Sequence, residues 1–391
     1  MLKQTNIGQK TGNARHYYTK EVVMWTISEN KQWANLESRF DWVNRMKEVP
    51  QDPRYHAEGD VAIHTQMVLK ALQNEATFQK LSAQDREILW AAALLHDVEK
   101  YSTTVYETDG SITSNGHARK GAQFARQLLY FNEPAPFAIR EQIVGLVRYH
   151  GLPIWLFEKS DPLKVLVKAS MEVNLEWLCL LARADMLGRI CNDQEEMLYR
   201  IACFEEYCKE NQCWGNARRF ESNQAQMYYM QNEDAYLDYI PFETPEAEVI
   251  LMCGLPGAGK DSYIKAHYND WPIISLDGIR NEKGISPTDK VGNGRVIQEA
   301  KERARVFLRK QQSFVWNATN TTSQMRMQLI DLFLTYKAKV NIVYIEVPYH
   351  SLHNQNKNRD AVVPAGVIDK LVRKLEVPAL WEAHNVVYRI R

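Results

Sequence analysis

The sequence lacks three features that would point to particular classes of protein. Positive and negative charges balance, with 48 Lys and Arg against 48 Asp and Glu, so a nucleic-acid partner would have to be held by local patches. None of the six cysteines forms a C-x-x-C pair, which argues against a zinc knuckle and favours a reduced, cytosolic protein. No apolar run approaches the about 20 residues that span a bilayer, and the polar segment from Met1 to Lys20 has no apolar core of a signal peptide. We therefore expect a cytoplasmic protein with no membrane partner.

Two parts of the chain differ in their hydrophobic pattern. With 391 residues, of which 45% are hydrophobic, the chain is long enough for two domains with separate cores. From Glu21 to Tyr207 apolar residues recur every three or four positions, which predicts helices, and no strong hairpin signal appears before residue 240. From residue 248 onward, short apolar runs alternate with helical spacing, which predicts a parallel sheet flanked by helices.

A change of composition marks the boundary between these parts. Residues 216–231 are polar and rich in Gln and Tyr, and Pro241–Pro245 predicts an extended connector. We therefore expect an all-α domain at 1–225, with its core at about 50–205, a connector at 226–247 and an α/β domain at 248–391. The expected strands are 249–253, 273–276, 314–316 and 340–347.

A phosphate-binding loop opens the second domain. Gly254-Leu255-Pro256-Gly257-Ala258-Gly259-Lys260 follows the first expected strand and leads into a helix, the context in which a G-x-x-x-x-G-K pattern binds phosphate. Glycines let backbone N–H groups surround the β-phosphate, the helix N-terminus adds positive charge, and Lys260 spans the β- and γ-phosphates. A glycine-rich turn with an incidental lysine is the much weaker alternative. We predict nucleotide contacts from Gly254, Gly257, Ala258, Gly259, Lys260, Asp261 and Ser262.

One position departs from this pattern. The hydroxyl residue that normally follows the lysine and holds Mg²⁺ is replaced by Asp261, with Ser262 behind it. An aspartate can hold Mg²⁺ directly or through water, because hard cations prefer oxygen ligands. It also brings negative charge close to the phosphates, so the identity of the Mg²⁺ ligand stays open.

The second expected strand is followed by an acidic and a basic residue one helical turn apart. Asp277 stands at the carboxyl end of that strand, the edge where open α/β sheets bind ligands, and Arg280 follows three residues later. Asp277 could take the proton from an attacking hydroxyl, and Arg280 could hold an acceptor phosphate bidentately. The alternative for Asp277 is a helix cap.

These segments resemble a known family across nearly all of 248–380. Together with Trp316-Asn317-Ala318-Thr319-Asn320, Asn356-x-x-Arg359-x-x-x-Val363-Pro364 and Leu375-Glu376-Val377-Pro378, they are similar to the 5′-hydroxyl polynucleotide kinases. The resemblance implies that Asp277 is the general base, that Arg280 contacts the acceptor phosphate, and that Arg359 is a lid arginine on the donor phosphates. It implies transfer from ATP or another NTP, with Mg²⁺, to a 5′-OH of RNA or DNA. Without the resemblance, a solvated surface arginine would be the better interpretation of Arg359.

Histidines are concentrated in the first domain. Five of the ten lie between residues 56 and 150, and the His96-Asp97 pair ends an apolar stretch. His64 and Asp185 lie in two other helical stretches. Imidazole and carboxylate groups that face inward are costly to bury, and a shared metal ion removes that cost. For any single histidine, a hydrogen-bonded core residue is the alternative, whereas the ordered set favours a metal.

The order His…His-Asp…Asp resembles the HD phosphohydrolase superfamily, over roughly residues 50–200. That family is all-α, and the resemblance implies that His64, His96, Asp97 and Asp185 hold a divalent metal. Two further segments, Gly116–Ala122 and Tyr149–Pro153, are similar to family segments that supply extra ligands or phosphate contacts, here from His117 and His150. His56-Ala57-Glu58-Gly59-Asp60-Val61 resembles a run near the first ligand in RNA-processing members, and it leaves His56 open between ligand, substrate contact and structural residue.

The expected metal and its surroundings suit phosphate chemistry. Mixed His and Asp ligands favour Mn²⁺, Fe²⁺, Co²⁺, Ni²⁺ or Zn²⁺ over Mg²⁺, and such a metal lowers the pKa of bound water so that hydroxide can attack phosphorus. Lys100, Arg119 and Arg148 lie close to the motif positions. We predict that these three residues contact the substrate phosphate.

The whole arrangement resembles the bacterial bifunctional HD-domain polynucleotide kinases that heal RNA ends. The resemblance implies that the first domain removes 2′,3′-cyclic phosphate or 2′- or 3′-phosphate, that the second phosphorylates 5′-OH ends, and that an RNA ligase is a functional partner. Two alternatives stay open. One is an HD nucleotidase fused to a kinase for a nucleoside or other small molecule, which the neutral net charge favours. The other is a non-catalytic NTP-sensing module, in which Asp261 weakens the use of Mg²⁺.

Overall fold

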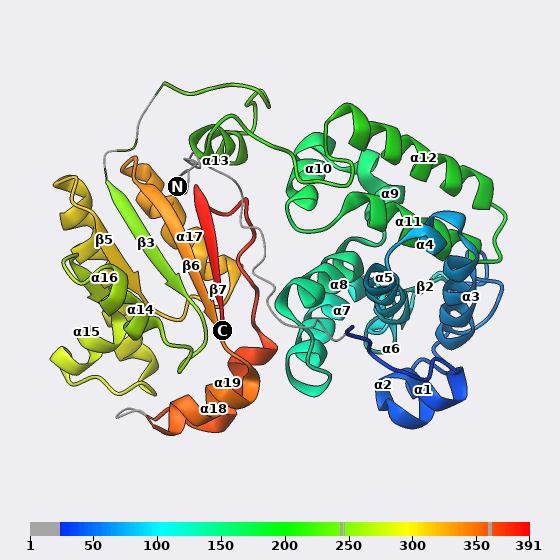
Figure 1. The fold of residues 1–391 in the computed structure, drawn as a ribbon, viewed down its shortest axis with the longest axis horizontal. Coiled ribbons are helices and arrows are strands. Elements are labelled where there is room, and N and C mark those ends of the chain that lie inside the picture. Colours follow the sequence, from blue (N-terminus) through cyan, green and yellow to red (C-terminus); the bar gives the residue numbers. More distant parts are fainter. Residues whose placement is uncertain (1–23, 243–244, 246, 359–361) are drawn as a thin grey trace, which may run out of the picture.

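A helical domain and a sheet domain lie side by side in the computed structural model, which describes residues 24–242, 245, 247–358 and 362–391 (Figure 1). The expected fold class is confirmed, because helices fill the first part and a five-stranded parallel sheet dominates the second. The helices of the first domain are α1 (Trp33–Arg39), α2 (Asp41–Asn44), α3 (Val61–Asn74), α4 (Ala76–Lys80), α5 (Ala83–Leu95), α6 (Lys100–Thr103), α7 (His117–Gln127), a π-helical turn (Leu128–Asn132), α8 (Phe137–Tyr149), α9 (Leu152–Trp155), a 3₁₀ turn (Leu156–Glu158), α10 (Pro162–Ser170), α11 (Leu175–Leu187), α12 (Gln194–Glu210) and α13 (Asn223–Gln231).

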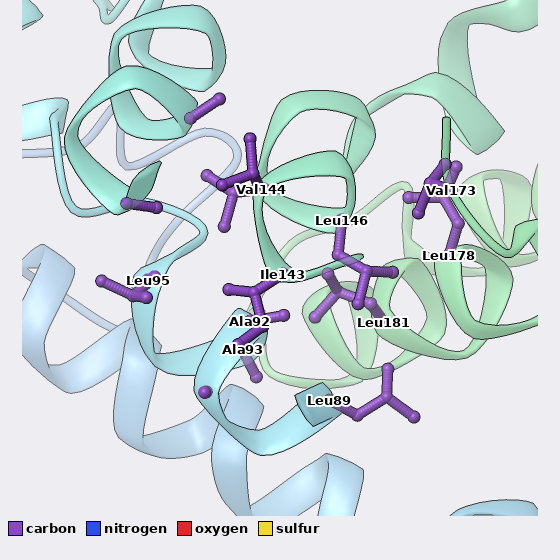
Figure 2. Packing of buried hydrophobic residues seen from close by; sticks show 14 of the residues in the cluster. Leu89, Ala92, Ala93, Leu95, Ile143, Val144, Leu146, Val173, Leu178 and Leu181 are labelled. Atoms are coloured by element: carbon purple, nitrogen blue, oxygen red, sulfur yellow. The ribbon is translucent and has the colours of Figure 1, made fainter. Parts of the chain in front are cut away.

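Helices α5, α8 and α11 form the centre of the helical domain (Figure 2). Three consecutive alanines of α5, Ala91–Ala93, are fully buried, and their small side chains let the neighbouring helices approach closely. Ile143 and Leu146 of α8 and Leu178 and Leu181 of α11 fill the space against them. Each fully buried side chain of this kind contributes about 1.5–3 kcal/mol to stability, so these three helices form a rigid base for whatever they carry.

Capping residues define where the central helices begin. The Asp60 side chain accepts a hydrogen bond from the Ile63 N–H at 2.9 Å and starts α3. The Asn174 side chain accepts from the first turn of α11 in the same way. Because a cap sets the start of the first turn, it also determines which later positions, His64 and Asp185 among them, face the interior.

One short hairpin in the helical domain was not indicated by the sequence pattern. Strands β1 (Val105–Tyr106) and β2 (Ile112–Thr113) pair antiparallel. Each has two residues, too few for an alternating pattern to be recognised. Gly110 in the connecting turn has a φ of +82°, the left-handed conformation that glycine adopts without strain.

The sheet domain has the strand order β4-β5-β3-β6-β7, with every pair parallel. Parallel strands with buried faces are expected to be nearly continuous in apolar residues, and β3 and β6 follow this rule. The four expected strands are present, and β7 is an additional one. The elements are β3 (Glu248–Cys253), α14 (Lys260–His267), β4 (Ile273–Ser275), α15 (Leu276–Lys283), α16 (Lys290–Arg309), β5 (Phe314–Asn317), α17 (Ser323–Thr335), β6 (Lys339–Glu346), α18 (Tyr349–Lys357), α19 (Ala365–Arg373) and β7 (Asn385–Ile390).

Buried polar contacts join the two domains along α8 and β6. The guanidinium of Arg140 on α8 donates two hydrogen bonds to the carboxylate of Glu346 on β6, at 2.9 and 2.7 Å. Tyr130 donates its hydroxyl proton to the Val347 carbonyl at 2.8 Å, and its ring packs in the core of the sheet domain. The domains are therefore held by an ion pair and a hydrogen bond that both lie out of water.

Helix α13 lies between the two cores, across the point at residue 226 where we expected the connector to begin. Tyr229 packs with the core of the helical domain, whereas Met227 packs with the core of the sheet domain. Gln226 donates a hydrogen bond to the Leu380 carbonyl at 2.9 Å. The first part of the expected connector is thus an ordered helix that contacts both domains.

Two candidate active sites

Histidine and aspartate side chains from three helices converge inside the helical domain. His64 lies on α3, His96 and Asp97 directly follow α5, and Asp185 lies on α11. All four are at most 2% exposed. One ligand atom from each of His64, His96 and Asp185 lies within 4.8 Å of the others. The structure therefore brings together the four residues that the sequence predicts as metal ligands.

A second group of ligand atoms adjoins the first. Asp97, His117 and His150 each place one atom within 4.8 Å of the others. His117 is the first residue of α7, and His150 directly follows α8. Asp97 lies next to both groups, because its Oδ2 is 3.2 Å from His96 Nε2 and its Oδ1 is 3.3 Å from His117 Nε2. Six predicted ligands thus form one continuous cluster.

Hydrogen bonds on the outer ring nitrogens determine the tautomers of these histidines. His96 Nδ1 lies 2.7 Å from the Ala93 carbonyl, and His64 Nδ1 lies 2.9 Å from a carboxylate oxygen of Glu58. A carbonyl or carboxylate oxygen accepts only, so each Nδ1 carries the proton, and the neutral ring directs a lone pair from Nε2. Both Nε2 atoms point into the cluster.

The same arrangement applies to the second group. His117 Nδ1 donates to the Ser114 carbonyl at 2.7 Å, and His150 Nδ1 donates to the Val147 carbonyl at 2.9 Å. The two Nε2 atoms then face each other at 3.2 Å, with a lone pair on each when the rings are neutral. Two facing lone pairs repel each other, and a cation bound by both removes the repulsion.

Several buried polar atoms of the cluster have no hydrogen-bond partner. They are His64 Nε2, His96 Nε2 and Asp97 Oδ1, whereas Asp97 Oδ2 has the Lys100 ammonium as a partner at 2.8 Å. His64 Nε2 does lie 3.0 Å from Asp185 Oδ1, but with its proton on Nδ1 it has no hydrogen to offer there. Leaving one buried polar atom unpaired costs about 1–3 kcal/mol, so three in one place indicate a site built for a ligand.

Burial and charge keep most of these groups in the form that binds metal. Burial, together with the neighbouring His117 and His96, lowers the pKa of His150 to about 3. Burial also lowers the pKa of His117. For Asp97, burial acts in the opposite direction, but His96 and Lys100 outweigh it and hold the pKa of the carboxyl well below its usual range. His96 is the exception among the histidines with a shifted pKa at the cluster, because the charge of Asp97 outweighs burial and raises its pKa. Neutral imidazole and ionised carboxylate are the protonation states that metals require.

The predicted substrate contacts of the helical domain lie in different places. Lys100 is buried, with Nζ 2.8 Å from Asp97 Oδ2 and 2.7 Å from Gln51 Oε1. Arg119 and Arg148 are exposed at the surface, and the Arg148 guanidinium lies over the Tyr149 ring at 5.7 Å. Lys100 therefore adjoins the cluster directly, whereas contacts from the two arginines stay a prediction.

The phosphate-binding loop connects β3 to α14 in the sheet domain. Gly254 has a φ of +144°, and a Cβ there would lie 2.4 Å from the Ile345 carbonyl oxygen. Glycine is needed at this position on both grounds. Lys260 begins α14, and its Nζ donates to the Gly254 and Leu255 carbonyls at 2.9 and 3.0 Å. The lysine side chain thus lies along the loop in which a phosphate would bind.

Asp261, the residue after Lys260, accepts a hydrogen bond from a neighbouring strand. Asp261 is exposed, and its Oδ1 accepts a hydrogen bond from Asn317 Nδ2 at 2.7 Å. Ser262 is exposed as well, whereas Ala258 is buried. The carboxylate of Asp261 therefore lies at the carboxyl ends of β3 and β5, where an Mg²⁺ ligand is expected.

Asp277 does not cap the helix in which it lies, which excludes the alternative considered for it. Ser275 is the cap of α15, because its Oγ accepts from the Gly278 N–H at 3.1 Å. Asp277 is exposed and forms an ion pair with Arg280, which also donates to Asn293 Oδ1 at 3.1 Å. The Asp277 carboxylate and the Arg280 guanidinium thus lie side by side at the carboxyl end of β4. The predicted lid arginine, Arg359, lies outside the described residues.

Comparison with known proteins assigns both domains. A family model of the HD domain matches residues 61–186, and a family model of the AAA domain matches residues 249–378. The chain joins an HD domain to a P-loop kinase-like domain.

Individual relatives cover only parts of the chain. The multifunctional CCA protein of Aromatoleum aromaticum (strain DSM 19018 / LMG 30748 / EbN1) is 36% identical over 110 residues, which are 28% of this chain and 24% of that protein. The match thus spans about a quarter of the relative. Two solved structures, one assigned as a kinase from Chloroflexus aurantiacus J-10-fl and one a sugar kinase from Janibacter sp. HTCC2649, cover 38% and 37% of this chain and 87% and 85% of theirs. They are 18% and 13% identical, with TM-scores of 0.32 and 0.29, and TM-scores this low carry no argument about substrate.

Two residues around the HD site were not among the predicted ones. Glu58 is 2.9 Å from His64 Nδ1 and from His56 Nδ1, and its other oxygen accepts from the Ile190 N–H at 2.9 Å. Arg189 donates two hydrogen bonds to the carboxylate of Asp185. Partners of this kind orient metal ligands and tune their basicity. The H-x-E-G-D-V run contained a signal for Glu58, and His56 contacts the site through this carboxylate.

The donor set of the HD domain fits a divalent transition metal. Imidazole nitrogens and carboxylate oxygens that converge with free lone pairs suit Mn²⁺, Fe²⁺, Co²⁺, Ni²⁺ or Zn²⁺. The kinase-like domain implies an NTP with Mg²⁺. Within the described ranges, no helix is long and apolar enough to cross a membrane.

Proposed function

We propose that this chain repairs the ends of cleaved RNA or DNA. The HD domain would remove a 2′,3′-cyclic phosphate, or a 2′- or 3′-phosphate, from one end, and the kinase-like domain would phosphorylate the 5′-OH at the other. The observation that carries the first activity is the convergence of imidazole lone pairs and carboxylates around Asp97. The second is supported by the Asp277–Arg280 pair at the same edge of the sheet as the phosphate-binding loop.

In the HD domain, the buried cluster would hold the metal through His64, His96, Asp97 and Asp185, with His117 and His150 adding ligands or substrate contacts. A metal bound there would supply a water of lowered pKa as the nucleophile. Lys100 places a positive charge beside Asp97, where it can attract a substrate phosphate.

In the kinase-like domain, different residues would bind the donor, accept the proton and bind the acceptor during phosphoryl transfer. Backbone N–H groups of the loop and Lys260 hold the β- and γ-phosphates. Asp277 accepts the proton of the 5′-hydroxyl as the 5′-oxygen forms its bond to the γ-phosphorus and the bond to the β-phosphate oxygen breaks. Arg280 binds a phosphate of the acceptor strand, which requires its ion pair with Asp277 to open.

The proposed products explain a functional partner. A strand with a 5′-phosphate and without a cyclic phosphate is the form in which two ends can be joined, so an RNA ligase would act next. The main competing function is an HD nucleotidase fused to a small-molecule kinase. The balanced net charge favours it, because no long-range basic field draws in a polynucleotide.

End-specific assays with purified full-length protein test the proposal. With NTP and Mg²⁺, the protein is expected to phosphorylate a 5′-OH oligonucleotide, and with Mn²⁺ or another transition metal it should release phosphate from a 2′,3′-cyclic end. A clear preference for mononucleosides over oligonucleotides would select the competing function. NTP binding with no transfer to any acceptor would instead support a sensing module.

A further inference from the structure

Arg391 follows β7 at the edge of the sheet where the phosphate-binding loop lies. Strands β6 and β7 are parallel, with Ile390 paired to Glu346, and the Arg391 N–H donates to the Glu346 carbonyl at 3.0 Å. Because all five strands are parallel, their carboxyl ends share one edge, and β3 ends there in the loop. The end of β7 is therefore anchored next to the site of phosphate binding.

The guanidinium of Arg391 lies directly against the loop. A Cβ built on Gly259 would be 3.3 Å from Arg391 Nη1 and 3.8 Å from its Cζ. Gly259 has a φ of +98° and is the residue immediately before α14, whose first residue is Lys260. The guanidinium thus lies beside Gly259, close to the N-terminus of α14.

This position is electrostatically unfavourable for a cation unless an anion binds. The N-terminus of a helix carries a partial positive charge, about half a unit, from its unpaired N–H groups. The guanidinium of Arg391 adds a full positive charge beside it. Among the residues that the structure describes, the Arg391 side chain makes no ion pair that would compensate it. A phosphate group at the loop would neutralise the charge of Arg391 and meet the positive end of α14.

The strand order shows which part of a nucleotide Arg391 would meet. Asp277 follows β4 at one side of the sheet, Arg391 follows β7 at the opposite side, and the loop follows β3 between them. The hydroxyl that attacks the γ-phosphate comes from the side of Asp277. The donor must then extend its α-phosphate and nucleoside toward β7.

We propose that Arg391 binds the α-phosphate of the donor nucleotide and so contributes to donor affinity. The inference rests on the proposed use of an NTP at the loop. A guanidinium donates charge-assisted hydrogen bonds to phosphate oxygens. Since the α-phosphate keeps its charge during transfer, the contact is equal in the ground and transition states, and its loss should weaken binding without slowing the chemical step.

Direct titration of the full-length protein with ATP·Mg²⁺ tests this. In Arg391→Gln the Kd should rise about 10- to 100-fold, the effect of losing one charge-assisted hydrogen bond, and Arg391→Lys should recover part of it. Arg389→Gln is the matched control, because Arg389 lies two residues earlier on β7 with its guanidinium over the Tyr263 ring at 5.8 Å. The Kd of the Arg389→Gln variant for ATP·Mg²⁺ should stay within about twofold of the native value, because substitutions of exposed residues away from a site have small effects.

Kinetics complete the test. In Arg391→Gln the KM for ATP should rise while kcat is retained, and an unchanged Kd or a loss confined to kcat would overturn the inference. Lys260→Ala separates this result from the proposed function. If that variant still binds ATP like the native protein, the loop is not the nucleotide site and the proposed function fails first. If it loses binding while Arg391→Gln does not, the inference about Arg391 alone is refuted.

Discussion

The buried ion pair between the domains offers a test of how firmly they are joined. Arg140 is 1% exposed and Glu346 is 6% exposed, and the pair is bidentate. Arg140 also donates to Glu141 at 2.7 Å, and Glu346 also accepts from the Tyr344 hydroxyl at 2.6 Å. In Arg140→Met the carboxylate of Glu346 keeps the tyrosine as partner but loses its counter-charge.

The expected magnitude follows from that loss. Removing one partner of a buried ion pair costs about 3–5 kcal/mol, and we expect this decrease in the free energy of unfolding for Arg140→Met. In Glu346→Gln, Arg140 keeps Glu141, so a smaller loss of about 1–3 kcal/mol is expected. The double variant should lose less than both single losses added, with a coupling energy of about 0.5–3 kcal/mol.

Urea unfolding followed by tryptophan fluorescence and circular dichroism measures these values. The pair lies between the domains, so the loss should appear in whichever transition occurs first. A decrease below about 0.5 kcal/mol for Arg140→Met, or strictly additive losses in the double variant, would refute the interpretation of this contact as a buried, coupled pair.

Three further predictions concern single side chains. Glu58→Gln removes the carboxylate that orients His64, and the affinity for metal should fall about 10- to 100-fold; competition with a chelator measures this, and an unchanged affinity would contradict the assigned role. Asp277→Asn should slow phosphoryl transfer to a 5′-OH oligonucleotide about 10²- to 10⁴-fold at saturating substrate and leave the Kd for ATP unchanged, as titration can show; transfer at the native rate would exclude it as the base. Burial, with the charge of Lys339, lowers the pKa of His384 from 6.5 to about 4, so the unfolded chain binds more protons between these values and stability falls as the pH drops through that window, by about 3 kcal/mol at most. His384→Asn should flatten this slope in unfolding experiments between pH 6.5 and 4, and an unaltered slope would assign the effect to other groups.

Local patterns were sufficient to predict much of the fold. The loop from Gly254 to Lys260 and its flanking strand and helix are contiguous in sequence, so motif and context can be recognised together. Strand β6, with the sequence KVNIVYIE, is a long and mostly apolar segment. By contrast β7, with the sequence NVVYRI, is half-buried and ends in two exposed residues. Its six residues give an apolar pattern too short to distinguish a strand from a loop.

The cluster of His and Asp side chains was predicted as a set of residues but not as a geometry. His64 and Asp185 are far apart in sequence, and no periodicity shows that their atoms lie 3.0 Å apart. Arg119 and Arg148 are each two positions from a histidine of the cluster. Residues two apart on a helix do not share a face, which explains why both arginines are exposed while the histidines face inward.

Contacts between the domains could not be predicted from the sequence, for a different reason. Arg140 and Glu346 each belong to an ordinary amphipathic or apolar segment, and their partnership arises when two separately folded surfaces meet. The same applies to Arg391, whose position next to Gly259 depends on the whole strand order of the sheet. Neither pair leaves a local pattern in the sequence.

The central claim is that one chain carries two independent end-modifying activities. Its most direct test is tandem mass spectrometry, which identifies the group at each end of an RNA strand that starts with a 5′-OH and a 2′,3′-cyclic phosphate, after incubation with NTP, Mg²⁺ and a transition metal. Native protein should add a phosphoryl group at one end and remove phosphate from the other. Asp97→Ala should perform only the first change, and Lys260→Ala only the second. An unaltered strand with the native protein, or loss of both changes in a folded single variant, would contradict the account.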